Sequence, residues 1–164
     1  MPTVDALFLQ LFHSTPLMLV TAQIIIHRPS LEVLQSFLHT QHTQAWWQGC
    51  HTFADVAAGY ISWQWRDAGG RFQYISSGEI QQYEPGLFLQ LRNMWQYDFE
   101  KANPLGPIDL LIECTPQSGQ TLLHIQHGPF ATHSAEWQAY AAAVESGWQQ
   151  VLPQLKQYLE RATI

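Results

Sequence analysis

Charged residues are scarce in this sequence. Only 12% of its 164 residues are Asp, Glu, Lys or Arg, and the seven Lys and Arg against thirteen Asp and Glu give a formal net charge of -6. A protein that binds a phosphate backbone needs a basic patch to neutralise it. The composition therefore predicts that nucleic acid is not a partner.

Cysteine is also rare, and long apolar runs are absent. Cys50 and Cys114 lie far apart and match no metal-ligand or redox spacing, which favours two buried thiols in a reducing compartment. No apolar run approaches the ~20 residues that span a bilayer. The apolar stretch at residues 6–12 follows Asp5 and has no Lys or Arg before it, unlike a signal peptide. We therefore expect a cytoplasmic protein without a membrane span.

Familiar catalytic and metal-binding patterns are missing as well. The sequence has no Gly-x-Ser-x-Gly elbow, no dinucleotide fingerprint and no phosphate loop. His124 and His127 are three apart on a predicted strand, so they lie on opposite faces and cannot share an ion simply. His39, His42 and His51 would need a favourable helix–loop geometry to converge as zinc ligands. We predict no metal and no cofactor.

The 46% hydrophobic content is typical of a globular protein, and no repeat or linker divides the chain. We predict one domain over residues 18–164, preceded by an N-terminal extension of residues 1–17. Leu7, Phe8 and Leu11 can line one face of a short helix in that extension. Because exposed apolar side chains favour contact with another protein surface, the extension is a candidate homodimer contact.

The first part of the domain reads as a strand followed by two short helices. Residues 18–27 contain three consecutive isoleucines at positions 24–26, which favour a strand. Arg28, Pro29 and Ser30 break it, and Ser30 is the predicted cap of the first helix. The apolar stripe of that helix consists of Leu31, Leu34, Phe37 and Leu38. A second short helix is predicted over residues 43–47.

The middle of the chain alternates in strands separated by turns. Trp63 and Trp65 share one face of a strand with Ile61. The predicted strands are residues 60–66, 71–83, 87–95, 108–115 and 121–127, with turns at 67–70, 84–86 and Gly119 and a loop at 98–107. Each connection is too short for a parallel crossover, so the sheet is predicted to be antiparallel.

The C-terminal segment has the clearest pattern in the chain. From Ser134 to the end, apolar residues recur at helical spacing, which predicts a helix of about 27 residues and roughly 40 Å. A helix with such a stripe needs a sheet on which to bury it. Pro153 lacks an N–H, so we expect a bend there.

Several motifs resemble one known family when they are taken in order. Residues 147–160 contain Gly147-Trp148 followed by spaced leucines and Tyr158-Leu159-Glu160, and residues 121–127 follow the pattern T-x-L-x-L-x-H in looser form. The pair Trp46-Trp47 follows the first helix, and residues 78–80 resemble a G-x-V strand. The chain thus resembles the activator-of-heat-shock-protein-90-ATPase-homologue-like (C-terminal domain) family of the START helix-grip superfamily.

The resemblance implies an α+β helix-grip (START-like) fold, in which a curved antiparallel sheet wraps around the long C-terminal helix, with two short helices after the first strand. It also implies a cavity for a hydrophobic small molecule between sheet and helix. Whether the chain's own tryptophans fill that cavity is left open. The predicted lining residues are Trp47, Trp63, Trp65, Tyr74, Phe88, Arg92, His127, Tyr140 and Trp148. Arg92 shares a face with Phe88 and Gln90, and its guanidinium is a candidate partner for a ligand carboxylate.

Three functions follow from this resemblance. The first is binding of an apolar or amphipathic small molecule in the cavity. The second is an enzyme of cyclase or dehydratase type, which needs a polar pair such as His127 with Tyr74 or Glu79. The third is a chaperone-associated regulatory protein, although the name-giving proteins carry an additional N-terminal domain for which residues 1–17 are too short.

Overall fold

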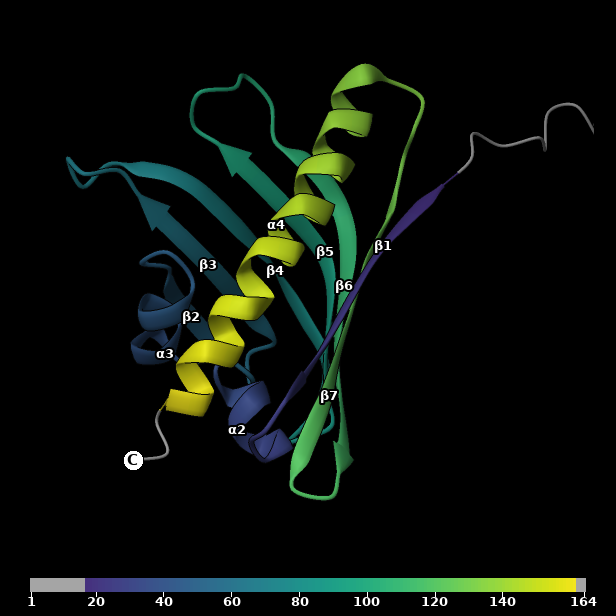
Figure 1. Ribbon diagram of the computed structural model, residues 1–164. Helices are drawn as coiled ribbons and strands as arrows, with labels where there is room; N and C mark the ends of the chain where they lie inside the picture. Colours follow the sequence, from purple (N-terminus) through teal and green to yellow (C-terminus); the bar gives the residue numbers. More distant parts are fainter. Residues whose placement is uncertain (1–16, 162–164) are drawn as a thin grey trace, which may run out of the picture.

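A seven-stranded antiparallel sheet curves around one long helix (Figure 1). The computed structural model describes residues 17–161. The strands are β1 (Met18–Ile26), β2 (His51–Asp55), β3 (Tyr60–Arg66), β4 (Phe72–Glu84), β5 (Phe88–Asp98), β6 (Leu105–Gln117) and β7 (Gln120–Phe130). Their order is β1-β7-β6-β5-β4-β3-β2, so β3 to β7 form the predicted meander, β2 adds a strand that was not predicted, and β1 pairs with β7. The helix-grip fold is confirmed.

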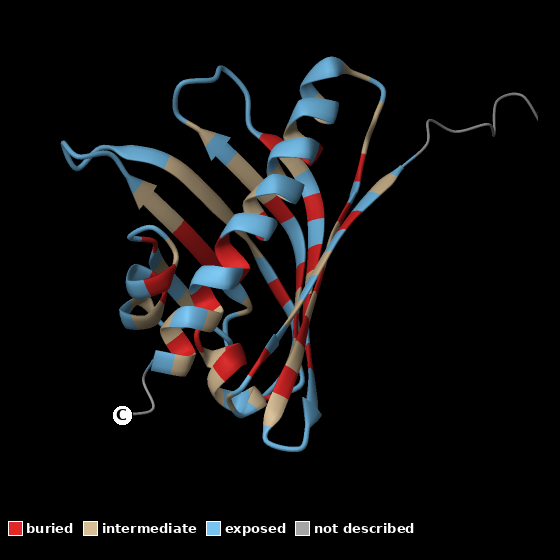
Figure 2. Ribbon diagram, in the orientation of Figure 1, coloured by how far each residue is buried: buried red, intermediate tan, exposed pale blue. Residues whose placement is uncertain are grey.

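The long helix α4 (Ala135–Arg161) crosses the concave face of the sheet. Its buried residues are Ala141, Trp148, Val151, Leu152, Leu155 and Leu159, and Figure 2 shows buried positions on the strands behind them. Because these residues recur every three to four positions, one side of the helix is apolar and needs the sheet for its burial. The helix continues through Pro153, which is exposed.

Polar contacts fix the last turns of α4 to the end of β1. Lys156 Nζ donates to the Ile25 carbonyl over 2.6 Å and forms an ion pair with Glu160 at 2.8 Å. The Glu160 carboxylate also accepts a hydrogen bond from the His27 backbone N–H at 2.9 Å. These contacts hold one end of the helix against the sheet and leave the space near its middle to the side chains of the site.

The two short helices are α2 (Ser30–Gln35) and α3 (Thr40–Trp46), and α2 differs in detail from its prediction. Ser30 is not the cap: the helix begins one residue earlier, with Val33 N bonded to Pro29 O, and no side chain caps it. Leu34, Phe37 and Leu38 are buried as predicted, but Leu31, also predicted to face the core, is 45% exposed, and Val33 is fully buried in its place. Val33 precedes Leu34 by one residue and Phe37 by four, so it lies on the same apolar face.

The segment after α2, residues 36–38, is buried and held by two indoles. Trp46 Nε1 donates to the Ser36 carbonyl and Trp63 Nε1 to the Phe37 carbonyl, both over 3.0 Å. Neither carbonyl pairs with a strand, and a buried carbonyl without a donor is costly. The side chains of α3 and β3 thus supply the hydrogen bonds that the backbone of this segment lacks.

A β-bulge interrupts the pairing of β4 with β5. Glu79 pairs with Arg92 and Ser77 with Trp95, so Gly78 lies opposite two residues, Asn93 and Met94. Asn93 has a positive φ of 52°, a conformation that Asn adopts more readily than most residues. The extra residue reverses the alternation of side chains along β5 beyond this point.

Two further predictions concern the loop at residues 98–107 and the N-terminal extension. Residues 98–107 were predicted to be a loop, but β6 already begins at Leu105, so the connection is shorter. The proposed dimer contact in the N-terminal extension falls on residues 1–16, which are outside the described part of the chain. Within residues 17–161, no helix is long and apolar enough to cross a bilayer.

Candidate functional site

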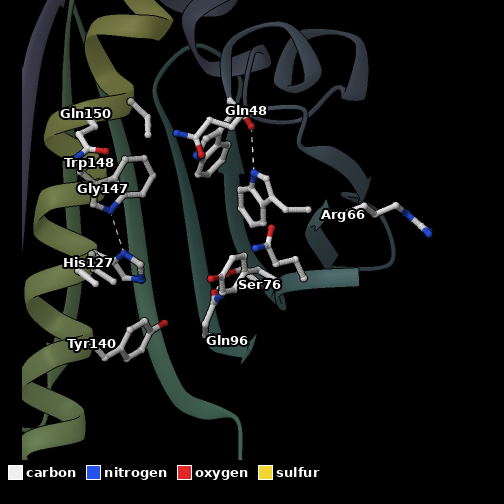
Figure 3. A pocket seen from close by; sticks show the side chains of 16 residues that line it. Gln48, Arg66, Ser76, Gln96, His127, Tyr140, Gly147, Trp148 and Gln150 are labelled. Carbon is white, nitrogen blue, oxygen red and sulfur yellow. Dashed lines mark hydrogen bonds between the residues drawn. The ribbon is translucent and has the colours of Figure 1, made fainter. Parts of the chain in front are cut away.

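A pocket lies between the middle of α4 and the concave face of the sheet, with walls from β3, β4, β5 and β7 (Figure 3). Its volume is about 430 Å³, within the roughly 300–1,000 Å³ of small-molecule sites. Exposed side chains at its rim, among them Gln48 and Gln150, show that it opens to solvent. The lining residues are Trp47, Gln48, Trp65, Arg66, Gln73, Tyr74, Ser76, Gln96, His127, Tyr140, Ala143, Val144, Gly147, Trp148, Gln150 and Val151.

A cluster of indoles forms the end of the pocket nearest α3. Trp47 is its centre, and the other ring centroids lie 4.9 Å (Trp46), 5.0 Å (Trp63), 5.2 Å (Trp65) and 5.6 Å (Trp148) from its own. The pairs are stacked, tilted or edge-on, and aromatic rings at such distances attract one another. The cluster fills one end of the space between sheet and helix and leaves the pocket beyond it unfilled.

The indole N–H groups of Trp65 and Trp148 are already used within the protein. Trp65 Nε1 donates to the Trp47 carbonyl over 3.1 Å, and Trp148 Nε1 donates to His127 Nδ1 over 3.1 Å. Each bond fixes the orientation of its ring before any ligand arrives. These two tryptophans therefore offer a ligand their aromatic faces and edges, not a hydrogen-bond donor.

The bond between Trp148 and His127 determines which His127 nitrogen carries the proton. An indole N–H can only donate, so Nδ1 must accept, and the proton of the neutral imidazole is on Nε2. Figure 3 shows the second ring nitrogen of His127 directed away from Trp148, on the pocket side. No hydrogen-bond acceptor for Nε2 occurs among the described residues, so this N–H is available to the pocket.

The ionisable groups of the pocket are held in their neutral forms. Burial lowers the pKa of His127 to about 4, because desolvation penalises the imidazolium, and the N–H of Trp148 opposes protonation of Nδ1 as well. Burial also raises the pKa of Tyr140, so its hydroxyl keeps its proton. At neutral pH, His127 and Tyr140 are therefore uncharged hydrogen-bonding groups.

The wall opposite α4 carries a further polar pair. Ser76 and Gln96 are cross-strand partners on β4 and β5, and the Ser76 hydroxyl donates to Gln96 Oε1. The amide nitrogen of Gln96 is left as a donor. Arg66 is the charged residue among the described lining residues, but it extends away from the cavity: its Nη1 donates to the Gly70 carbonyl and its guanidinium lies 3.9 Å from the Phe72 ring.

Six of the nine predicted lining residues occur in the pocket wall: Trp47, Trp65, Tyr74, His127, Tyr140 and Trp148. Trp63 does not, because it is only 2% exposed and lies behind Trp47 in the core. Phe88 and Arg92 also lie outside the wall. They alternate with the fully buried Leu89 and Leu91, so they point to the outer face. Their prediction assigned the wrong face of β5.

The β5 residue that does reach the pocket is Gln96, which the sequence interpretation missed. Simple alternation puts it on the same face as Arg92, and the bulge at Asn93 reverses this. The predicted pair of His127 with Glu79 does not form, because exposed Glu79 accepts a hydrogen bond from Asn93 Nδ2 at 3.1 Å. Tyr74 does line the same pocket as His127.

The positions of the described residues favour neither a reactive cysteine nor a metal site. Burial raises the pKa of Cys50 to about 11 and that of Cys114 to about 12, so both stay thiols at neutral pH. Within the described part of the chain, no three His, Cys, Asp or Glu side chains converge on a point that could hold a metal ion.

We expect the half-buried His127 to make stability depend on pH, with about 2 kcal/mol lost between pH 7 and pH 5. Its folded pKa of about 4 lies below the ordinary value of 6.5, so the unfolded chain binds more protons between these values. The contribution is complete above pH 6.5 and is lost as the pH falls toward 4. Urea unfolding at pH 7, 6 and 5 measures it.

The matched variants for this measurement are His127→Gln and His133→Gln. His127→Gln removes the titrating group but keeps an oxygen that can accept from Trp148, so its stability should fall less steeply with acid. His133 is exposed, and its replacement should leave the slope of the wild type unchanged. Equal slopes in all three proteins would contradict the assignment to His127.

Comparisons with known proteins agree with the fold just described. A sequence comparison with curated proteins gave no significant match. The family model for activator of Hsp90 ATPase homolog 1-like protein matches residues 28–160, from just after β1 to the last turn of α4. The chain belongs to this family.

Solved structures similar to this member of the activator of Hsp90 ATPase homolog 1-like family share its fold at low sequence identity. DynU16, from the dynemicin biosynthetic locus, is 17% identical with a TM-score of 0.67 over 87% of this chain and 47% of its own. MLL2253 from Mesorhizobium loti is 15% identical, with a TM-score of 0.66 over 90% of this chain and 100% of its own. The Aha1 dimer from Colwellia psychrerythraea is 14% identical, with a TM-score of 0.63 over 90% of this chain and 99% of its own. This chain spans less than half the length of DynU16, and these similarities show the fold alone.

Proposed function

We propose that this protein binds an apolar or amphipathic small molecule in the pocket between α4 and the sheet. The observation that carries the proposal is a cavity of about 430 Å³ that opens to solvent and is walled by indole rings in fixed orientations. Apolar pockets with a few well-placed polar groups are the usual form of small-molecule sites. Fixed aromatic walls also reduce the entropy lost on binding.

The same geometry supports binding over acid–base catalysis. No carboxylate occurs among the described lining residues, and the Nδ1 lone pair of His127 is occupied by Trp148. A general base needs a free lone pair within reach of the proton that it removes. The nitrogen that His127 turns to the pocket carries a proton at neutral pH, which suits recognition of a ligand.

The test is a titration with N-phenyl-1-naphthylamine, an uncharged apolar dye that becomes fluorescent in apolar sites. We expect saturable binding by the wild type and a loss of at least about tenfold in affinity for Val144→Trp, because the larger side chain occupies space that the ligand needs. Gln149→Trp is the matched control: it puts the same side chain on an exposed position of α4 outside the lining, and should bind like the wild type.

Two outcomes would refute the proposal. One is the absence of saturable binding of this dye and of other uncharged apolar probes to the folded wild type. The other is equal affinity in Val144→Trp and Gln149→Trp, which would place the dye elsewhere. Native mass spectrometry of the protein from its own source then identifies a co-purified ligand by its mass.

A further inference from the structure

We propose that His127 recognises an acceptor oxygen, such as a carbonyl, on an uncharged ligand, and that Trp148 fixes the imidazole in the donating tautomer. This inference rests on the proposed function and specifies the ligand's chemistry. It starts from a bond inside the protein: Trp148 Nε1 donates to His127 Nδ1 over 3.1 Å, and only the neutral Nε2–H form satisfies that bond.

The arrangement of backbone elements holds this pair rigidly. Trp148 is 5% exposed on α4, and its ring also lies against Trp47. His127 is on β7, where it contacts the Phe130 ring at 5.3 Å. Both rings are thus packed on two sides. The Nε2–H therefore has a fixed direction, which is what gives a hydrogen bond its discrimination between ligands.

Two other polar groups of the pocket, Gln96 and Tyr140, favour the same kind of ligand. The Gln96 oxygen is occupied by Ser76, which leaves the amide N–H groups as donors on the opposite wall. The Tyr140 hydroxyl bonds to no other described residue and can donate as well. His127, Gln96 and Tyr140 thus each offer a donor to the pocket, and acceptor oxygens on a ligand complement these three groups.

The residues around the pocket disfavour a charged ligand. Arg66 is the charged lining residue, and its guanidinium is held outside the cavity by the Gly70 carbonyl and the Phe72 ring. A carboxylate in the pocket would lose its hydration without gaining a cationic partner. The indole faces of Trp47, Trp65 and Trp148 favour a flat, unsaturated framework. We therefore infer a flat, uncharged ligand with at least one carbonyl-type oxygen.

Matched probes separate these properties. The pair 9-fluorenone and fluorene differs by one carbonyl oxygen, and the pair 9-fluorenone-4-carboxylate and its methyl ester differs by one charge. Affinities are measured by displacement of N-phenyl-1-naphthylamine at pH 7.5. For the wild type we expect the ketone to bind about 3- to 10-fold more tightly than the hydrocarbon, and the ester at least about 10-fold more tightly than the carboxylate.

Variants assign the oxygen preference to one residue. His127→Phe keeps a flat ring but removes the donor, so the ratio of ketone to hydrocarbon affinity should fall to about one while fluorene still binds. His127→Gln retains an acceptor for Trp148 and a donor for the ligand, so part of the preference should survive. Gln149→Met, at an exposed position of α4 outside the lining, is the control and should keep the preference, and Gln96→Met shows whether the donor on the opposite wall contributes to it. Loss of the preference in Gln96→Met but not in His127→Phe would overturn the assignment.

A second measurement needs no variant and no ligand. Nitrogen-15 NMR of the histidine rings distinguishes the two tautomers and the imidazolium, and it should show His127 protonated on Nε2 alone from pH 6 to pH 8. A proton on Nδ1, or an imidazolium in this range, would refute the proposal. If N-phenyl-1-naphthylamine and fluorene bind without any preference for the ketone, this inference fails and the proposed function stands. If no uncharged probe binds, the proposed function itself fails.

Discussion

Trp63→Ala is expected to lower the free energy of unfolding by about 4–5 kcal/mol, the upper part of the range for such truncations. Trp63 is 2% exposed, its ring packs against Trp47 at 5.0 Å, and its N–H satisfies the Phe37 carbonyl. The substitution creates a cavity and removes the donor of a buried carbonyl, so two separate costs add. Denaturant unfolding followed by far-UV circular dichroism measures the change without relying on the fluorescence of the missing indole.

Two further variants separate these costs. Trp63→Phe retains most of the ring volume but lacks the N–H, so we expect a loss of about 2–3 kcal/mol. Trp137→Ala, at a half-buried position near the start of α4, is the control for removing an indole and should lose only about 1 kcal/mol. A loss for Trp63→Ala no larger than that for Trp137→Ala would show that Trp63 does not occupy the core as described.

Gly78→Ala is expected to destabilise the protein by about 2–3 kcal/mol, the cost of overpacking. A Cβ at this position would overlap Met94 Sδ and lie 2.8 Å from the Arg92 carbonyl oxygen. The side chain of Met94 can move, but the carbonyl belongs to the backbone of β5 and cannot move without disturbing the sheet. Thermal and denaturant unfolding both measure the effect.

The control for this prediction is Gly147→Ala. Gly147 is inside α4, and a Cβ there would have no atom within 4 Å, so the variant should gain about 0.5–1 kcal/mol from helix propensity. The double variant Gly78→Ala/Met94→Ala should not regain the stability of Met94→Ala alone, because the backbone contact persists. If it does, the strain comes from the methionine side chain and not from the close approach of the strands.

The regular parts of this fold were predictable because their side-chain periods continue without interruption. The apolar stripe of α4 keeps its spacing from Trp137 to Leu159, so both the helix and its buried face follow from the sequence. The alternation of Ile61, Trp63 and Trp65 likewise identifies the inner face of β3. Short connections then require the antiparallel meander, since no crossover can fit between these strands.

The site was less predictable where one residue breaks the period. Leu89 and Leu91 face the core, and continued alternation would put Gln96 on the outside with Arg92. The bulge at Asn93 brings Gln96 into the pocket instead. The signal in the sequence is weak: Asn tolerates the left-handed conformation, but most asparagines do not adopt it. A bulge depends on how two strands pair, which the residues of one strand do not determine.

The bond between His127 and Trp148 was unpredictable for a different reason. Both residues were expected in the pocket from their places on β7 and α4, and both lie there. Their hydrogen bond, however, depends on the depth and rotation at which α4 packs on the sheet. Contacts to β1, such as that of Lys156 with the Ile25 carbonyl, help to set this position. Side-chain pairs across a packed interface follow from docking, which hydrophobic periodicity leaves undetermined.

The indole bonds to residues 36–38 have a consequence for how this protein opens. A connecting segment is usually among the first regions to exchange with solvent, because it has few buried contacts. Here the Ser36 and Phe37 carbonyls are bonded to Trp46 and Trp63, which are themselves core residues. Residues 36–38 cannot detach without exposing the interior, so this connection belongs to the same cooperative unfolding unit as the sheet.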